Sequence, residues 1–125
     1  MGSKLEKPRA LLVDDDEPDR HHNRDIFLRE GFTVDEAVNG REALDRIREN
    51  SYDIIVLDIL MPYVDGYEVM RHLKMQRPDV LNRTVVVSRL NLKDMKVFFP
   101  GCRLIQKPAS REDLMRAARE YRMKQ

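Results

Sequence analysis

Four acidic residues follow an apolar run near the start of the chain, in the stretch LLVDDDE at residues 11–17. Carboxylates crowded together repel one another, and they are costly to place beside a buried segment. Two explanations are open: the acids form a solvated turn, or some of them hold a cation. Other reactive residues stand at comparable positions, because Asp58 ends the run IIVL, Ser88 ends VVV and Lys107 follows LIQ.

These residue types together suit phosphoryl transfer. Asp14, Asp15 and Asp58 offer carboxylate oxygens with no His or Cys beside them, a donor set typical of Mg²⁺. Lys107 can neutralise a phosphoryl group, and Ser88 can donate a hydrogen bond to one. A carboxylate can also be the nucleophile that accepts phosphate, and a metal would reduce its repulsion from the incoming group. The residues therefore predict phosphoryl transfer onto an aspartate.

Strands and helices must alternate along the chain to position these residues. The short apolar runs predict strands at 9–13, 33–38, 53–58, 84–88 and 102–106. Periodicity and capping residues predict helices at roughly 18–30, 39–50 and 110–125, and one from the turn at 61–66 to about Gln76. This alternation indicates an α/β fold, a five-stranded parallel sheet doubly wound by helices. Ligands bind at the carboxyl ends of strands in such sheets, so we expect the acids, the hydroxyl and the lysine to meet there.

The composition is typical of a single soluble domain. The chain has 125 residues, 42% hydrophobic and 36% charged, with a formal net charge of +1. This balance gives no reason to expect nucleic acid or an acidic membrane as a partner, and no apolar run approaches the ~20 residues that span a bilayer. The N-terminus lacks the apolar stretch of a secretion signal, and the single cysteine, Cys102, fits a reducing cytoplasm. We expect tails at 1–8 and 123–125 around one domain at 9–122.

Five segments together resemble the receiver domain of two-component response regulators, which has the CheY-like fold. They are LLVDDDEP, NGREAL, DIIVLDILMPYVDGYEVMRHLK, VVVS and LIQKP. The resemblance covers almost the whole chain and implies the strand order 2-1-3-4-5. It implies that Asp58 is the phosphoacceptor and that Asp14 and Asp15 are the acid pair for Mg²⁺, with Asp15 the more direct ligand. The backbone carbonyl of Leu60 would complete the protein ligands.

The resemblance also implies how the site is used. Lys107 would pair with the phosphoryl group, Ser88 would turn inward to bond it, and the peptide before Pro108 would be cis. The donor would be a phosphohistidine on a sensor histidine kinase or a phosphotransfer protein. The protein would be a cytoplasmic signalling switch that catalyses only its own phosphorylation and dephosphorylation. Its downstream partner, any homodimer, and whether it is a stand-alone regulator or one domain of a longer protein are left open by the sequence.

The segment from Ser88 to Lys107 departs from the family pattern. Arg89 stands where a small residue is usual, and it either crowds the site or reaches the phosphoryl group as a second cation. Leu104 replaces the aromatic residue whose ring moves inward on activation. The segment is also shorter than usual by roughly one turn of 3.6 residues, and its apolar residues share no single face. We therefore expect a short, shifted or irregular fourth helix and an atypical relay.

Two further positions bear on how long the phosphoryl group would last. Leu60 lies two residues after Asp58, and Leu90 lies two residues after Ser88. In the family these positions flank the path of the attacking water. Neither leucine can orient that water, so we expect slow self-dephosphorylation.

Three other functions are compatible with parts of the sequence. The altered 88–104 region suggests a degenerate receiver that binds partners without phosphorylation, although Asp15, Asp58 and Lys107 are intact. A phosphatase of the haloacid dehalogenase type would use the D-x-D spacing of Asp14 and Asp16, but that class places its nucleophile on the first strand. A flavodoxin-like flavin protein is weaker still, because the first strand leads to acids instead of a hydroxyl-rich phosphate loop. Asp16 and Glu17 are better explained as acids at the start of the following helix.

Overall fold

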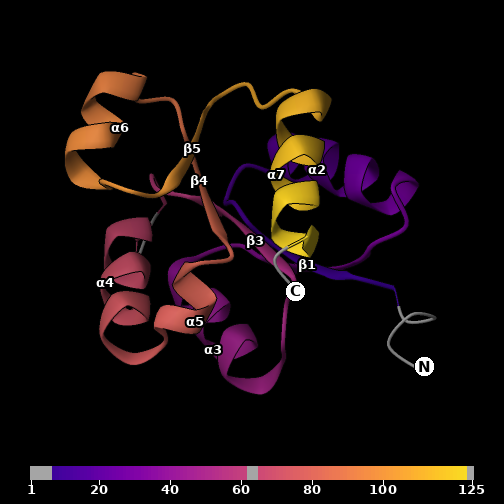
Figure 1. Ribbon diagram of the computed structural model, residues 1–125, viewed down its shortest axis with the longest axis horizontal. Coiled ribbons are helices and arrows are strands. Elements are labelled where there is room, and N and C mark those ends of the chain that lie inside the picture. The colour runs from indigo at the N-terminus through magenta and orange to yellow at the C-terminus, as the bar shows by residue number, and fades with distance from the viewer. Residues whose placement is uncertain (1–6, 62–64, 124–125) are drawn as a thin grey trace.

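The computed structural model describes residues 7–61 and 65–123, and these contain a five-stranded parallel sheet (Figure 1). The strands are β1 (Arg9–Val13), β2 (Thr33–Ala37), β3 (Ile54–Asp58), β4 (Thr84–Ser88) and β5 (Arg103–Gln106). Their order across the sheet is β2-β1-β3-β4-β5. The predicted fold class and strand order are therefore confirmed. Most of the predicted tail at 1–8 and the centre of the predicted turn at 61–66 lie outside the described residues.

Helices cover both faces of the sheet. They are α2 (Glu17–Arg29), α3 (Gly40–Glu49), α4 (Gly66–Gln76), α5 (Pro78–Leu81), α6 (Leu92–Phe98) and α7 (Arg111–Met123). Successive side chains of a strand point to opposite faces. In β1, Leu12 therefore packs in the apolar layer under α2 and α7, whereas Leu11 packs in the layer under α3, α4 and α6. In the part of the chain that the structure describes, no helix is both long and apolar enough to cross a membrane.

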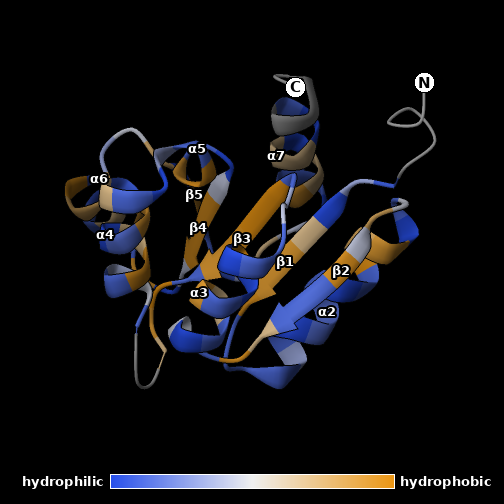
Figure 2. Ribbon diagram, turned by 90° about the horizontal axis from the view of Figure 1, so that it is seen from below, coloured by the Kyte–Doolittle hydropathy of each residue, from blue (hydrophilic) through white to orange (hydrophobic). Residues whose placement is uncertain are grey.

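The central strands β3 and β4 are buried along their whole length and apolar except at their ends. Every residue of β3 and β4 is buried, because helices lie on both sides of these strands. Figure 2 shows the contrast between β3, which is hydrophobic, and the edge strand β2, which is largely hydrophilic. Polar residues in β3 and β4 are confined to strand ends, at Asp58, Thr84 and Ser88. Two of these three, Asp58 and Ser88, stand at the carboxyl ends.

Side chains cap five of the described helices at their first turns, and α2, α3 and α7 illustrate the contact. Asp16 Oδ2 accepts the Asp19 N–H at 2.9 Å at the start of α2. At the start of α3 Asn39 Oδ1 accepts the Glu42 N–H, and at the start of α7 Ser110 Oγ accepts the Asp113 N–H. These contacts satisfy backbone donors that have no partner within the helix. Asp16 thus serves α2, as the sequence pattern predicts.

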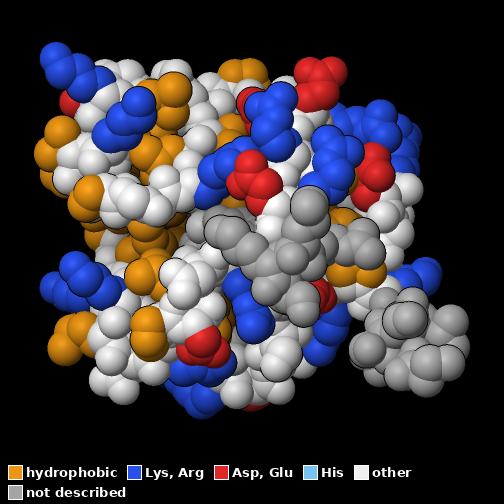
Figure 3. Space-filling model, viewed as in Figure 1, with side chains coloured by type: hydrophobic (Ala, Val, Ile, Leu, Met, Phe, Trp, Pro, Cys, Tyr) orange, Lys and Arg blue, Asp and Glu red, His pale blue; other side chains and the backbone are white. Residues whose placement is uncertain are grey.

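The segment between β3 and β5 holds the two least regular helices. The sequence pattern does not predict α5, because its four residues are too few to show a helical period; Pro78 closes α4 and opens this extra turn. The expected short fourth helix is confirmed, since α6 has seven residues and buries only Met95 among them. Val97 and Phe98 remain exposed. Figure 3 shows apolar side chains gathered on the surface between α6 and α4.

Candidate functional site

The carboxyl ends of four strands bring the predicted residues to one edge of the sheet. Asp14 follows β1, and Asp58 ends β3. Ser88 ends β4 and pairs in register with Gln106 of β5. The Lys107 N–H then donates to the Ser88 carbonyl oxygen at 2.8 Å. Strand pairing therefore extends to the residue that carries the ammonium group and fixes where its side chain begins.

Asp14, Asp15 and Asp58 form an acidic cluster. Each offers one carboxylate oxygen, and these oxygens lie within 4.8 Å of one another. Asp14 and Asp58 are buried, with 4% and 5% of their surface exposed, whereas Asp15 is exposed. A pocket of about 290 Å³ opens beside Asp15 and is also lined by Leu60 and Asp65. Hard oxygen donors next to open space are a set that suits Mg²⁺.

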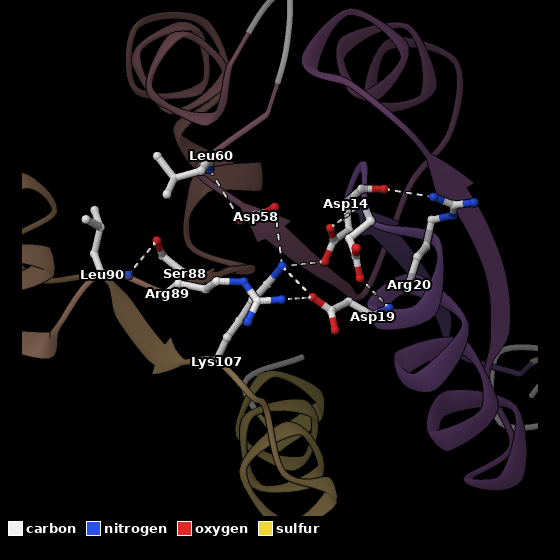
Figure 4. Close-up of polar contacts among 10 residues, drawn as sticks. Asp14, Asp19, Arg20, Asp58, Leu60, Ser88, Arg89, Leu90 and Lys107 are labelled. Atoms are coloured by element: carbon white, nitrogen blue, oxygen red, sulfur yellow. Dashed lines mark hydrogen bonds and ion pairs between the residues drawn. The ribbon is translucent and has the colours of Figure 1, made fainter.

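Lys107 lies at the centre of the carboxylates (Figure 4). Its Nζ is 2.9 Å from Asp14 Oδ2, 3.1 Å from Asp19 Oδ2 and 3.3 Å from Asp58 Oδ2. Only 5% of its side chain is exposed. Burial alone would lower the pKa of Lys107, but the hydrogen bond to Asp14 and the charges of Asp58 and Asp14 outweigh it and raise the pKa. The residue is therefore a cation held among acids.

One ammonium does not fully compensate the acids. Burial raises the pKa of Asp58, Lys107 lowers it, and the charge of Asp14 raises it again, with a net result of about 7. A buried carboxylate with this pKa is poorly stabilised in its ionised form. A second cation beside Asp58 would favour ionisation, which is what a carboxylate nucleophile requires. The electrostatics of the cluster thus fit a metal ion at this position.

Backbone N–H groups hold the side chains of Asp58 and Ser88. The Leu60 N–H donates to Asp58 Oδ1 at 3.3 Å, and the Leu90 N–H donates to Ser88 Oγ at 3.2 Å. Ser88 is fully buried, whereas the Leu60 side chain is 51% exposed. The two leucines therefore flank the site as apolar groups, one exposed and one partly buried. The role of the Leu60 carbonyl as a metal ligand stays a prediction.

Arg20 fixes the backbone that carries the first acids, and sequence reasoning missed it. Its Nη1 donates to the Asp14 carbonyl oxygen at 3.0 Å, and its Nε donates to Glu36 Oε1 at 2.9 Å. The arginine thereby ties the loop after β1 to the neighbouring strand β2. One of many charged residues on α2, it carried no signal in the sequence that would single it out.

Asp19 is a second residue that sequence reasoning missed. It lies in the first turn of α2, and its Oδ2 contacts both Lys107 Nζ at 3.1 Å and Arg89 Nη2 at 3.0 Å. Burial alone would raise the pKa of Asp19, but the bonds and charges of Lys107 and Arg89 outweigh it and lower the pKa. Arg89, the departure from the family pattern, is thus tied to the site through a carboxylate.

The structure also shows the peptide before Pro108 and the surroundings of Leu104. The peptide between Lys107 and Pro108 is cis, as the resemblance implies. Leu104 is partly buried and packs against the apolar layer that includes Met95 of α6. A leucine in this layer makes apolar contacts, but it has no ring or hydroxyl that could form different contacts in two states of the protein.

The position of Asp16 argues against the phosphatase alternative. A D-x-D pair would require its carboxylate at the site, yet its Oδ2 is bonded to the Asp19 N–H at the start of α2. The acid grouped with Asp14 and Asp15 is Asp58, from β3.

Comparisons with known proteins agree with this geometry. The family model of the response regulator receiver domain matches residues 10–119. The chain is 43% identical over 72 residues to the response regulator MprA of Mycolicibacterium vanbaalenii, covering 58% of this chain and 31% of that protein. It is 42% identical over 66 residues to the transcriptional regulatory protein ResD of Bacillus subtilis, covering 53% of this chain and 28% of ResD. The chain thus spans about a third of the length of these two relatives.

The fold has a close counterpart among solved structures. The receiver domain of Francisella response regulator 1452 superposes with a TM-score of 0.84 at 29% sequence identity. The match covers 95% of this chain and 100% of that one.

Proposed function

This chain belongs to the response regulator receiver domain family, and from that premise we propose that Asp58 accepts a phosphoryl group from a phosphohistidine. The observation that carries the proposal is a cluster of three carboxylates, two of which contact a buried lysine. Asp14 and Asp58 each lie within ion-pair distance of the Lys107 Nζ, and the Asp15 carboxylate completes the acidic cluster. The family implies a histidine kinase as partner; the particular kinase, the output and any homodimer are further proposals, as is a cytoplasmic location.

We propose that Mg²⁺ is held by Asp14, Asp15, Asp58 and the backbone carbonyl of Leu60. Burial and the charge of Asp14 disfavour ionisation of Asp58, and the donors are oxygens alone. When bound, the ion would stabilise the ionised nucleophile and reduce its repulsion from an incoming phosphate. The residues of the chain then supply the remaining steps.

The chemical step is a displacement at phosphorus. A carboxylate oxygen of Asp58 forms a bond to phosphorus, and the bond between phosphorus and the imidazole nitrogen of the donor breaks. The electron pair of that bond goes to the nitrogen, and because the other ring nitrogen of the phosphohistidine carries a proton, neutral histidine is the leaving group. In the unphosphorylated protein the Lys107 Nζ lies 3.3 Å from Asp58 Oδ2. During the transfer this ammonium group pairs with a phosphoryl oxygen as negative charge develops there. Ser88 donates its hydroxyl hydrogen to the same group after leaving its contact with the Leu90 N–H.

Dephosphorylation breaks the covalent bond between phosphorus and Asp58. Water attacks phosphorus, the bond from phosphorus to the carboxylate oxygen breaks, and inorganic phosphate leaves. The side chains of Leu60 and Leu90 flank the site and carry no group that accepts a hydrogen bond from that water. The signalling state should therefore persist.

Intact-mass measurement tests the proposal. The protein and Asp58→Asn are incubated with phosphoramidate and Mg²⁺, and the mass of each is followed with time. We expect one phosphate adduct on the wild-type protein and none on the variant. A folded wild-type protein without an adduct would instead favour an interaction module that works without phosphorylation. Phosphate release that survives Asp58→Asn would favour a phosphatase.

A further inference from the structure

Arg89 and Lys107 share one carboxylate oxygen beside the phosphorylation site. Asp19 Oδ2 lies 3.0 Å from Arg89 Nη2 and 3.1 Å from Lys107 Nζ, while the same Nζ lies 3.3 Å from Asp58 Oδ2. A single ammonium therefore separates Asp58 from the carboxylate that Arg89 binds. Figure 4 shows the guanidinium group extending from the end of β4 across to Asp19 on α2, next to Lys107.

The contact between Arg89 and Asp19 is suited to exchange. The Arg89 side chain is 64% exposed, and ion pairs at such exposure contribute little to stability. A phosphoryl group on Asp58 would offer three acceptor oxygens and close to two negative charges, against one charge on Asp19. A guanidinium group binds phosphate through two parallel N–H donors. The same side chain thus has a weak partner now and a stronger one once Asp58 is modified.

We propose that Arg89 is a second cationic ligand of the phosphoryl group on Asp58, and that Asp19 is the carboxylate that holds Arg89 and Lys107 before phosphorylation. This inference rests on the proposed function. It assigns Arg89 a direct contact with the phosphoryl group and Asp19 a positioning role. Asp19 keeps both cations beside the site but competes with the phosphoryl group for them.

The two residues should therefore act in opposite directions. Arg89→Ala removes a phosphoryl ligand, so we expect the affinity for beryllofluoride with Mg²⁺, a stand-in for the phosphoryl group, to fall about fivefold to tenfold. Asp19→Asn frees both cations, so we expect the affinity and the phosphorylation rate with phosphoramidate to rise severalfold. Arg89→Lys keeps the charge but loses the paired donors, and it should fall between the wild-type protein and Arg89→Ala. Arg48→Ala is the matched control, because Arg48 is also an exposed arginine paired with an aspartate, Asp45, on α3.

A change in the overall field of the protein would also give opposite signs, so two further measurements separate it from direct contact. In the Arg89→Ala background the gain from Asp19→Asn should shrink, because part of that gain acts through Arg89; independent field effects would add. The NMR signal of the Arg89 Nε–H group should also shift on addition of beryllofluoride and Mg²⁺.

Three outcomes decide the inference. Opposite effects, a smaller gain in the double variant and a shifted Nε–H signal support it. If the wild-type protein takes the phosphate adduct but Arg89→Ala behaves like Arg48→Ala and the Nε–H signal stays in place, the inference is wrong while the proposed function stands. If the folded wild-type protein takes neither phosphate nor beryllofluoride, the proposed function fails and the inference fails with it.

Discussion

Asp58 is the residue at which stability and reactivity conflict most directly. It lies at the buried end of β3, beside a second buried acid, Asp14. Its pKa is raised to about 7, first by burial and then by Asp14, despite the attraction of Lys107. Folding therefore disfavours the ionised form that a nucleophile needs. The fold can tolerate this cost, because the apolar layers on both faces of the sheet form its core.

Asp58→Asn should consequently stabilise the protein when no metal is present. The folded pKa of Asp58 lies above its ordinary value of 3.8, so ionisation of Asp58 costs the wild-type protein stability as pH rises from about 4 through 7, and the variant lacks this contribution. At pH 8 with a chelator we expect the variant to be more stable by about 1–3 kcal/mol. Urea denaturation at pH 5 and pH 8 measures the difference. A gap that is equal at both pH values would contradict the electrostatic explanation.

Leu60 gives a prediction about the lifetime of the phosphorylated state. Its side chain is exposed beside the pocket that opens at Asp15, where an amide could bond to a water molecule. Leu60→Asn should therefore speed the loss of phosphate severalfold, and Leu60→Met should leave the rate almost unchanged. Mass measurement after removal of the phosphodonor follows both variants. Equal rates for the asparagine and methionine variants would show that the side chain does not act on the water.

At the residue scale, the sequence pointed to groups at strand ends that the structure brings together, and it missed groups on helices. Asp14, Asp58 and Lys107 could be found because each interrupts or follows an apolar run. Asp19 and Arg20 could not, because charged residues are common on exposed helix faces. Only the packing of α2 against the sheet brings their side chains to Lys107 and to the Asp14 carbonyl.

At the scale of elements, predictability followed the regularity of burial. The buried strands stand out as continuous apolar runs, and their predicted bounds differ from the observed ones by at most one residue at an end. α5 has only one buried residue, Val80, and α6 has only Met95. Such helices leave no periodic pattern. The sequence could predict that α6 is short, because the segment from Ser88 to Lys107 is shorter than the family pattern and its apolar residues share no single face, but not where its first turn begins.

The junction between β3 and α4 gives an element-scale prediction. At Gly66 an added Cβ would lie 2.4 Å from the Ile59 Cα and 2.8 Å from the Asp58 carbonyl oxygen. The Gly66 N–H also donates to the Ile59 carbonyl oxygen at 3.0 Å. α4 can start against the loop after Asp58 only because this residue has no side chain. Gly66→Ala should lower the free energy of unfolding by roughly 1–3 kcal/mol and slow the phosphorylation of Asp58.

Gly31→Ala is the control for this prediction. Gly31 has a φ of +89°, but nothing lies within 4 Å of an added Cβ. Its replacement therefore measures backbone strain without a steric clash and should leave phosphorylation unchanged. Thermal or urea unfolding, together with the mass assay, separates the two variants. A Gly66→Ala protein that is phosphorylated at the wild-type rate would show that the junction does not position the site.

At the scale of the whole molecule, the apolar layers and the acidic cluster occupy different regions and act in opposite directions on stability. Two groups of buried side chains hold the helices to the two faces of the sheet. The acids gather at the carboxyl ends of β1 and β3, where Lys107 is the ammonium group that bridges Asp14 and Asp58. A cation bound there removes repulsion in the folded state only, since the unfolded chain does not bring these acids together.

Mg²⁺ should therefore raise the stability of the whole domain. A ligand that binds only the folded state stabilises it by RT ln(1 + [L]/Kd), which is about 1.4 kcal/mol at tenfold the Kd. For a domain of this size that corresponds to an increase of a few degrees in Tm.

Asp15→Asn should abolish most of the increase, because Asp15 is the exposed acid of the cluster. NaCl at matched ionic strength controls for general screening of charge. The same increase with NaCl, or in Asp15→Asn, would mean that the acids do not form a metal site. An increase in Tm that is specific to Mg²⁺ would also bring the stability of the wild-type protein closer to that of Asp58→Asn. The cation relieves the same repulsion that the asparagine removes.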